Sequence, residues 1–172
     1  MAKKLVAADA SPLIGLAAAD AFELLERLFG RVTVTPEVRD EVLAGGELPG
    51  AAELVAAIAS GWVEVAGARG DPGRFPELGA GEASTLLIAL AHPEDECLVL
   101  MDDALGRAQA RALGIPVTGL AGVLLAARRA RLVRRLRPLF ERLERSNFRI
   151  SNEIVRAVLE AAGEMEPPKR RR

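Results

Sequence analysis

The stretch Lys4-Leu5-Val6-Ala7-Ala8-Asp9-Ala10-Ser11-Pro12 decides the fold of this chain. Residues 6–8 show no polar alternation, so both faces of the strand that they form are expected to be buried, as in a parallel sheet covered by helices. Asp9 follows where this strand ends. Ser11 and Pro12 are typical of a helix N-cap and a first helical position, so a helix is predicted to follow directly. An acid at the carboxyl end of a buried parallel strand lies where open α/β sheets bind ligands.

Composition limits the class of protein. At 172 residues, half of them hydrophobic and 3 % aromatic, the chain is long enough for one domain with an aliphatic core. One cysteine excludes a disulfide framework, and no apolar run approaches the roughly 18 residues of a membrane helix. Only a few apolar residues separate Lys4 from Asp9, which is too short for a signal peptide. We therefore expect a soluble, cytoplasmic protein with no membrane partner.

Charge is distributed unevenly along the chain. Residues 1–106 contain 7 Lys+Arg and 18 Asp+Glu, whereas residues 107–172 contain 16 and 6. An acidic half can hold cations and a basic half can hold polyanions, although solvated helix faces and a basic tail give the same distribution. We predict a single domain over residues 1–165, with a C-terminal helical extension from about residue 120, and a basic, disordered tail over residues 166–172.

Strand and helix patterns alternate along the chain. Further strands are expected at 32–34, 62–65, 97–101 and 115–117. Helices are expected at 12–19, 20–29 with Asp20 as N-cap, 36–44, 51–60, 83–91, 104–113, 120–131, 134–145 and 152–162. This alternation predicts an α/β fold, a three-layer α/β/α sandwich around a five-stranded parallel sheet in the order 3-2-1-4-5. Pro116 favours an edge position for the fifth strand.

Acidic residues stand at the carboxyl ends of the two strands that are adjacent in the middle of this sheet. Asp9 ends the first strand, and Asp102 and Asp103 end the fourth, so all three face the switch point between those strands. Glu82 and Glu41 lie on neighbouring helices that can reach the same crevice. Carboxylates this close repel one another unless a cation lies between them. Carboxylate oxygens suit Mg²⁺ or Mn²⁺, which can activate a water for attack on a phosphodiester.

Each acid also has a structural interpretation. Asp9 can cap the helix that follows it, and one of Asp102 and Asp103 can cap the next one, but the sequence does not say which. Glu82 can complement a helix dipole, and Glu41 can be an exposed helix residue. Competing motifs are absent: there is no Walker lysine, no third glycine for a dinucleotide site and no partner set for a zinc site.

Taken together, these segments resemble a PIN domain of the short, stand-alone prokaryotic branch related to VapC-type toxins. The resemblance covers roughly residues 4–162. Its marks are Asp9-Ala10-Ser11-Pro12-Leu13-Ile14, Pro36-Glu37-Val38 with Glu41-Val42, Gly81-Glu82-Ala83, Leu100-Met101-Asp102-Asp103, and Gly114-Ile115-Pro116-Val117-Thr118-Gly119. Two departures concern substrate handling: Ala104 stands where this branch usually has Arg, with Arg107 further on, and Leu120 stands where a polar residue is common.

The resemblance implies a function. It implies a divalent-metal-dependent endoribonuclease that cleaves single-stranded RNA with a metal-activated water and is the toxin of a toxin–antitoxin pair. The implied metal ligands and catalytic residues are Asp9, Glu41, Glu82, Asp102 and Asp103, with Ser11 and Thr118 in support. The cofactor is then Mg²⁺ or Mn²⁺, and the partners are RNA, an antitoxin protein and a second copy of the chain.

The basic half then has an RNA-binding role, because phosphate contacts give sequence-independent affinity. We expect Arg107, Arg111, Arg128 and Arg129 to flank the crevice. Two alternatives stay open: a nucleic-acid-binding or regulatory module with little or no catalysis, motivated by Ala104, and a housekeeping nuclease outside any toxin pair. The apolar stretches 13–19 and 22–29 can form either a dimer surface or core.

Overall fold

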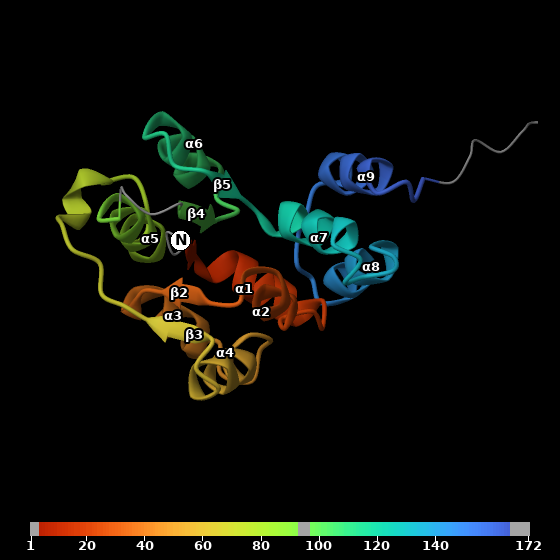
Figure 1. Cartoon of the computed structure of the whole chain (residues 1–172), viewed down its shortest axis with the longest axis horizontal. Helices are drawn as coiled ribbons and strands as arrows, with labels where there is room; N and C mark the ends of the chain where they lie inside the picture. Colours follow the sequence, from red (N-terminus) through yellow and green to blue (C-terminus); the bar gives the residue numbers. More distant parts are fainter. Residues whose placement is uncertain (1–3, 93–96, 166–172) are drawn as a thin grey trace, which may run out of the picture.

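The computed structural model describes residues 4–92 and 97–165. Its strands are β1 (Leu5–Ala8), β2 (Val32–Val34), β3 (Val63–Val65), β4 (Cys97–Leu100) and β5 (Val117–Thr118). They pair in parallel in the order β3-β2-β1-β4-β5 (Figure 1). The predicted strand order and the edge position of β5 are thereby confirmed. The tail predicted for residues 166–172 lies outside the described residues.

The helices account for most of the remaining chain. They are α1 (Ala10–Ala18), α2 (Leu24–Phe29), α3 (Pro36–Ala44), α4 (Ala51–Ala59), α5 (Ala80–Leu90), α6 (Ala104–Ala112), α7 (Leu120–Arg129), α8 (Arg137–Arg145) and α9 (Asn152–Ala161), with a 3₁₀ turn at Pro72–Arg74. None of the helices in the described ranges is both long and apolar enough to cross a bilayer.

Two predicted helix N-caps are wrong, and the helices expected to begin at 83 and 134 begin at Ala80 and Arg137. The first helix begins at Ala10, with Asp9 in the N-cap position, so Ser11 lies inside the first turn instead of capping it. Asp20 does not cap α2, because its φ of 54° is left-handed and α2 begins only at Leu24. Asp is among the few residues that tolerate this conformation.

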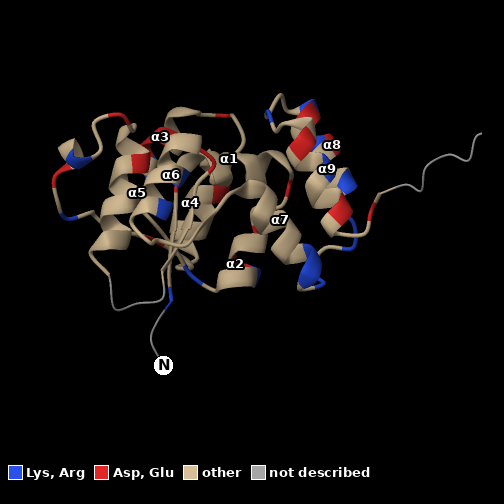
Figure 2. Ribbon diagram, turned by 90° about the horizontal axis from the view of Figure 1, so that it is seen from above, with Lys and Arg blue, Asp and Glu red and all other residues tan. Residues whose placement is uncertain are grey.

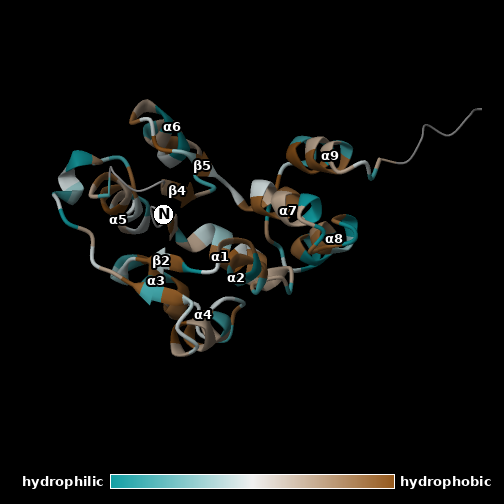
Figure 3. Ribbon diagram, viewed as in Figure 1, coloured by the Kyte–Doolittle hydropathy of each residue, from teal (hydrophilic) through white to brown (hydrophobic). Residues whose placement is uncertain are grey.

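Hydrophobic side chains fill both faces of the sheet. Val6 and Leu100 pack with buried residues of α1, α2 and α7 on one face. Val99 and Met101 pack with α5 and α6 on the other, so neighbouring residues of β4 point to opposite layers. Figure 3 shows the strands as hydrophobic segments between these helices. The predicted three-layer, aliphatic core is therefore present.

Helix α3 joins the two layers, since it contacts both α1 and α5. Its start is as predicted: Thr35 Oγ1 accepts a hydrogen bond from the Val38 N–H (3.3 Å), and Pro36 takes the first helical position. Because α3 follows the carboxyl end of β2, it carries Glu41 toward the ends of the central strands.

The C-terminal helices pack on the first two. Helix α7 contacts α1, α2 and α9, and α8 contacts α1. The close contact of α1 with α7 favours glycine at position 15, because a Cβ there would lie 2.5 Å from Leu120 Cδ2 and the Leu120 side chain would have to shift. Leu13, Leu16 and Leu25 are fully buried here, so the apolar faces of the first two helices belong to the core.

Candidate metal centre

Asp9 holds the central position of the site. It is 3 % exposed, and its backbone N–H donates to the Leu100 carbonyl of β4 (2.9 Å). Although Asp9 stands at the N-cap position of α1, its side chain makes no capping hydrogen bond. Its Oδ1 is buried and has no hydrogen-bond partner among residues 4–92 and 97–165. A helix-capping role therefore does not account for this carboxylate.

The structure separates the roles of the two acids after β4. Asp103 Oδ2 accepts a hydrogen bond from the Gly106 N–H (2.6 Å) and so caps α6. Asp102 Oδ1 accepts from the Leu120 N–H at the start of α7 (2.8 Å), and the Ser11 hydroxyl also bonds its carboxylate. Its Oδ2 is buried without a partner in the described part of the chain. Asp102, and not Asp103, is therefore the acid that faces Asp9.

Two glutamates approach from helices. A Cβ on Gly81 would lie 2.9 Å from Glu41 Oε2 and 3.1 Å from Asp9 Oδ1, so these two oxygens converge over the same glycine. Glu82 stands in the first turn of α5, with its carboxylate folded against Gly79. The position of Gly81 lets carboxylates from β1 and α3 approach each other across α5.

Electrostatics couple these four acids. The pKa of Asp9 is raised from 3.8 to about 7. Burial is the largest cause, the Ala10 N–H opposes it, and the negative charges of Glu82, Glu41 and Asp102 add to it. Burial and then Glu82 raise the pKa of Glu41. Burial also raises the pKa of Asp102, while the Leu120 N–H, the Arg107 charge and the Ser11 hydroxyl oppose this. The acids thus form one interacting group, as expected for side chains that share a site.

A buried chain of hydroxyl groups sets the spacing of the two glutamate helices. Ser84 donates to the Gly81 carbonyl (3.0 Å), and its oxygen lies 2.8 Å from Thr35 Oγ1, with both side chains at most 4 % exposed. Thr85 donates to the same carbonyl (2.8 Å). The sequence identified Thr35 only as a helix cap, and no local signal pairs it with Ser84, 49 positions away.

The predicted phosphate-binding residue Arg107 lies beside Asp102. A Cβ on Gly119 would overlap Asp102 Oδ1 and would lie 2.6 Å from Arg107 Nη1, so the guanidinium stands beside this aspartate. Arg111 follows one turn further along α6 and is exposed. The Thr118 side chain lies against Gly122 in the first turn of α7, and the described hydrogen bonds include none from its hydroxyl to an acid.

Helix α7 separates the other two predicted arginines from the acids. Its first residue, Leu120, donates to Asp102, and its last two are Arg128 and Arg129. At 1.5 Å per residue this places them about 13 Å away along the helix. In Figure 2 the blue turn after α7 lies on the side of α2. These two arginines therefore belong to another surface.

The donor set fits a hard divalent cation in chemistry. Asp9 Oδ1 and Asp102 Oδ2 are buried acid oxygens without partners in the described ranges, and buried polar atoms are rarely left so. Oxygen ligands are those that Mg²⁺ and Mn²⁺ prefer. As the side chains stand, no group of three or more His, Cys, Asp and Glu in the described ranges closes around an ion. A third carboxylate ligand therefore requires a glutamate side chain to move, while water can fill the other positions.

The comparison with protein families agrees with this geometry. The family model DUF3368, a PIN domain, matches residues 5–164. No curated protein matches the chain. The matched region contains every strand of the sheet and all the acids described above. The chain therefore belongs to the PIN-domain family.

Proposed function

We propose that this PIN-domain protein, a nuclease-type hydrolase by its family, is a divalent-metal-dependent endoribonuclease that cleaves single-stranded RNA. One observation carries the proposal: two buried acid oxygens, Asp9 Oδ1 and Asp102 Oδ2, come from adjacent strands and have no partner among the described residues. An electropositive group between them would offset the burial that raises both pKa values and the repulsion that adds to the pKa of Asp9.

We assign the metal to Asp9 and Asp102, with Glu41 and Glu82 completing the set. When bound, Mg²⁺ or Mn²⁺ supplies an acidified water and positive charge next to the phosphate. We leave Asp103 out of the proposed ligand set, because its Oδ2 accepts the Gly106 N–H and caps α6. Ser11 and the Leu120 N–H orient the carboxylate of Asp102, which holds one of its oxygens toward Asp9.

Arg107 is assigned to the phosphate. Its guanidinium stands beside Asp102 and makes no ion pair or hydrogen bond with the described residues, so it is free for a phosphate oxygen. Positions 104 and 107 share a helix face, so Arg107 supplies from the next turn the charge that Ala104 lacks. In-line attack by water, with departure of the 3′ oxygen, leaves a 5′-phosphate and a 3′-hydroxyl.

Metal removal tests this function. Purified protein with Mn²⁺ is expected to cleave a labelled single-stranded RNA at internal positions, and EDTA is expected to abolish cleavage until Mn²⁺ is restored in excess. Electrophoresis of the products and analysis of their ends measure the outcome. RNA binding without turnover in any divalent metal would instead support the non-catalytic module that Ala104 suggested.

The cellular role is a further part of the proposal. The motifs shared with VapC-type proteins support a toxin that pairs with an antitoxin and forms a homodimer. A housekeeping nuclease has the same site, so growth arrest on expression, relieved by an adjacent antitoxin gene, distinguishes the two roles.

Gly81→Ala is expected to weaken Mn²⁺ binding about 10- to 100-fold, the usual effect of disturbing the support of a metal ligand. The added methyl group would lie 3.1 Å from Asp9 Oδ1, which is too deeply buried to move freely. Alanine suits a helix, so the fold is expected to persist. Titration calorimetry measures the affinity. Gly67→Ala is the matched control, since its Cβ has no atom within 4 Å; equal affinity in both variants would contradict the convergence of acids over Gly81.

A further inference from the structure

A second charged site lies at the far end of α7. A cavity of about 460 Å³ is lined there by Arg128, Arg134, Arg135, Arg137 and Glu164. Four arginines and one glutamate line the cavity, so its lining carries an excess of positive charge. Arg134 and Arg135 belong to the segment that connects α7 to α8.

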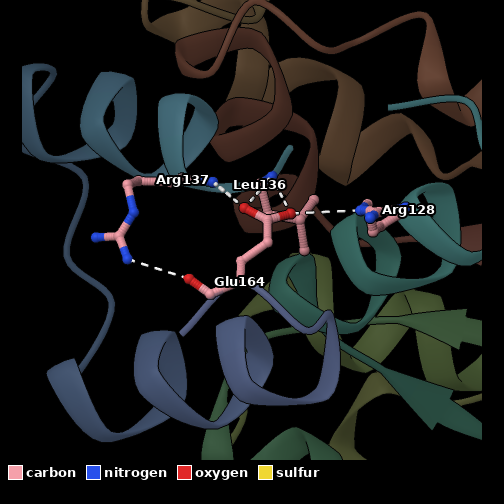
Figure 4. Close-up of polar contacts among 4 residues, drawn as sticks. All are labelled: Arg128, Leu136, Arg137 and Glu164. Carbon is pink, nitrogen blue, oxygen red and sulfur yellow. Dashed lines mark hydrogen bonds and ion pairs between the residues drawn. The ribbon is translucent and has the colours of Figure 1, made fainter. Parts of the chain in front are cut away.

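Glu164 shows how this site binds an anion (Figure 4). Both carboxylate oxygens accept hydrogen bonds from the Leu136 N–H (2.8 and 2.9 Å), and Oε2 also accepts from the Arg137 N–H (3.2 Å). Arg128 Nε lies 3.4 Å from Oε1, and the Glu164 side chain is only 9 % exposed. The chain's own carboxylate thus occupies the positive end of α8, where backbone N–H groups and the helix dipole favour anions.

Two of the four arginines remain available. Arg128 and Arg137 both bond Glu164, but Arg134 and Arg135 are exposed and have no hydrogen bond or ion pair with any described residue. Glu164 offsets only one of the four positive charges that line the cavity, and among the described residues Arg134 and Arg135 have no acidic partner. Unpaired arginines around an opening attract an external anion.

The chemistry of the lining favours a nucleic-acid backbone over an acidic protein. The planar fork of arginine matches phosphate oxygens in a bidentate arrangement. A protein partner usually needs an apolar pocket for an anchoring side chain, and the lining offers only Met165 for this. In the sequence, Glu166 follows Met165, and the basic residues Lys169, Arg170, Arg171 and Arg172 come after it.

We propose that Arg134 and Arg135, at the mouth of the cavity closed by Glu164, form an exosite that binds backbone phosphates of RNA away from the cleaved bond. Arg128, which lines the same cavity, lies about 12 Å along α7 from Leu120, the residue that bonds Asp102, so the exosite would contact a part of the strand outside the metal centre. The inference rests on the proposed function only in naming RNA as the polyanion.

Equilibrium RNA binding tests the exosite. Fluorescence anisotropy of a labelled single-stranded RNA in EDTA, over a series of salt concentrations, separates binding from cleavage. The Arg134→Gln/Arg135→Gln double variant is expected to reduce the slope of log K against log salt by about 1.4, which at about 50 mM salt is roughly 10- to 100-fold weaker binding. An unchanged thermal midpoint is expected, because neither side chain bonds the described residues.

The control variant removes two other exposed arginines, by Arg69→Gln/Arg149→Gln, with the same loss of charge. An equal loss of RNA affinity in both double variants would show that only the total charge matters, which would overturn the exosite. Unchanged RNA binding in Arg134→Gln/Arg135→Gln would also overturn it. Binding of labelled poly-glutamate is measured in the same way. If Arg134→Gln/Arg135→Gln lost poly-glutamate binding but retained RNA binding, the pocket would be assigned to an acidic protein instead. Because RNA binding is measured in EDTA, its result does not depend on whether the protein cleaves RNA. A failure of the nuclease proposal can therefore be distinguished from a failure of the exosite proposal.

Discussion

Asp9→Asn is expected to lower Mn²⁺-dependent RNA cleavage by about 10³-fold or more, since a metal ion contributes several kcal/mol of charge stabilisation and Asp9 is the central ligand of the proposed site. The variant is also expected to fold at least as stably as the unsubstituted protein. Asn has the same shape and removes a carboxylate that burial penalises, as the raised pKa of Asp9 shows. Initial cleavage rates and thermal unfolding, measured on the same preparations, give both results.

Asp103→Asn is the matched control for this prediction. It makes the same chemical change on a neighbouring strand end, but Asp103 caps α6, and Asn is an equally good cap. We expect cleavage and stability near those of the unsubstituted protein. Cleavage that persists in Asp9→Asn, or that falls equally in Asp103→Asn, would contradict the assignment of the acids.

The metal-free protein is expected to lose stability as pH rises from about 4 to about 7. The pKa of Asp9 is about 7 in the folded state and 3.8 in the unfolded chain, so over this interval the folded state holds a proton that the unfolded state has released. The contribution is fully present below the unfolded pKa and is lost as pH rises through the folded one. Its size is at most about 4 kcal/mol, and the raised pKa values of Glu41 and Asp102 act in the same direction.

Urea unfolding over a pH series, in EDTA and in Mn²⁺, measures this effect. Mn²⁺ is expected to restore stability above about pH 7, because a bound cation stabilises the folded state by mass action. Asp9→Asn is expected to flatten the pH dependence in EDTA. A metal-free protein whose stability rises over the same interval would show that Asp9 is not the buried, repelled carboxylate described here.

The sequence predicts the sheet well because its strongest signals are local and redundant. An apolar strand that ends on Asp9, and a second that ends on Asp102, both belong at the centre of a parallel sheet, and their switch point follows from the alternation of strands and helices. Helix starts are less certain. Asp9, Ser11 and Pro12 all suit the start of a helix, and only the structure shows that Asp9 takes the N-cap position and leaves Ser11 to bond Asp102.

Other features depend on contacts that local patterns do not encode. The choice between Asp102 and Asp103 depends on which carboxylate reaches Gly106 and which reaches the start of α7. The pairing of Thr35 with Ser84 joins two helices far apart in sequence. Charge counts located a basic half, but only the path of α7 shows that Arg128 lies away from the acids.

An anomalous-scattering measurement on crystals soaked in MnCl₂ tests the metal centre most directly. The account predicts a Mn²⁺ peak between Asp9 and Asp102, with oxygen ligands at about 2.0–2.2 Å and Glu41 or Glu82 turned toward it. Crystals of Asp9→Asn are expected to show no peak at this position. A peak at another site, or none beside Asp9 and Asp102 in well-ordered crystals of the unsubstituted protein, would contradict the account.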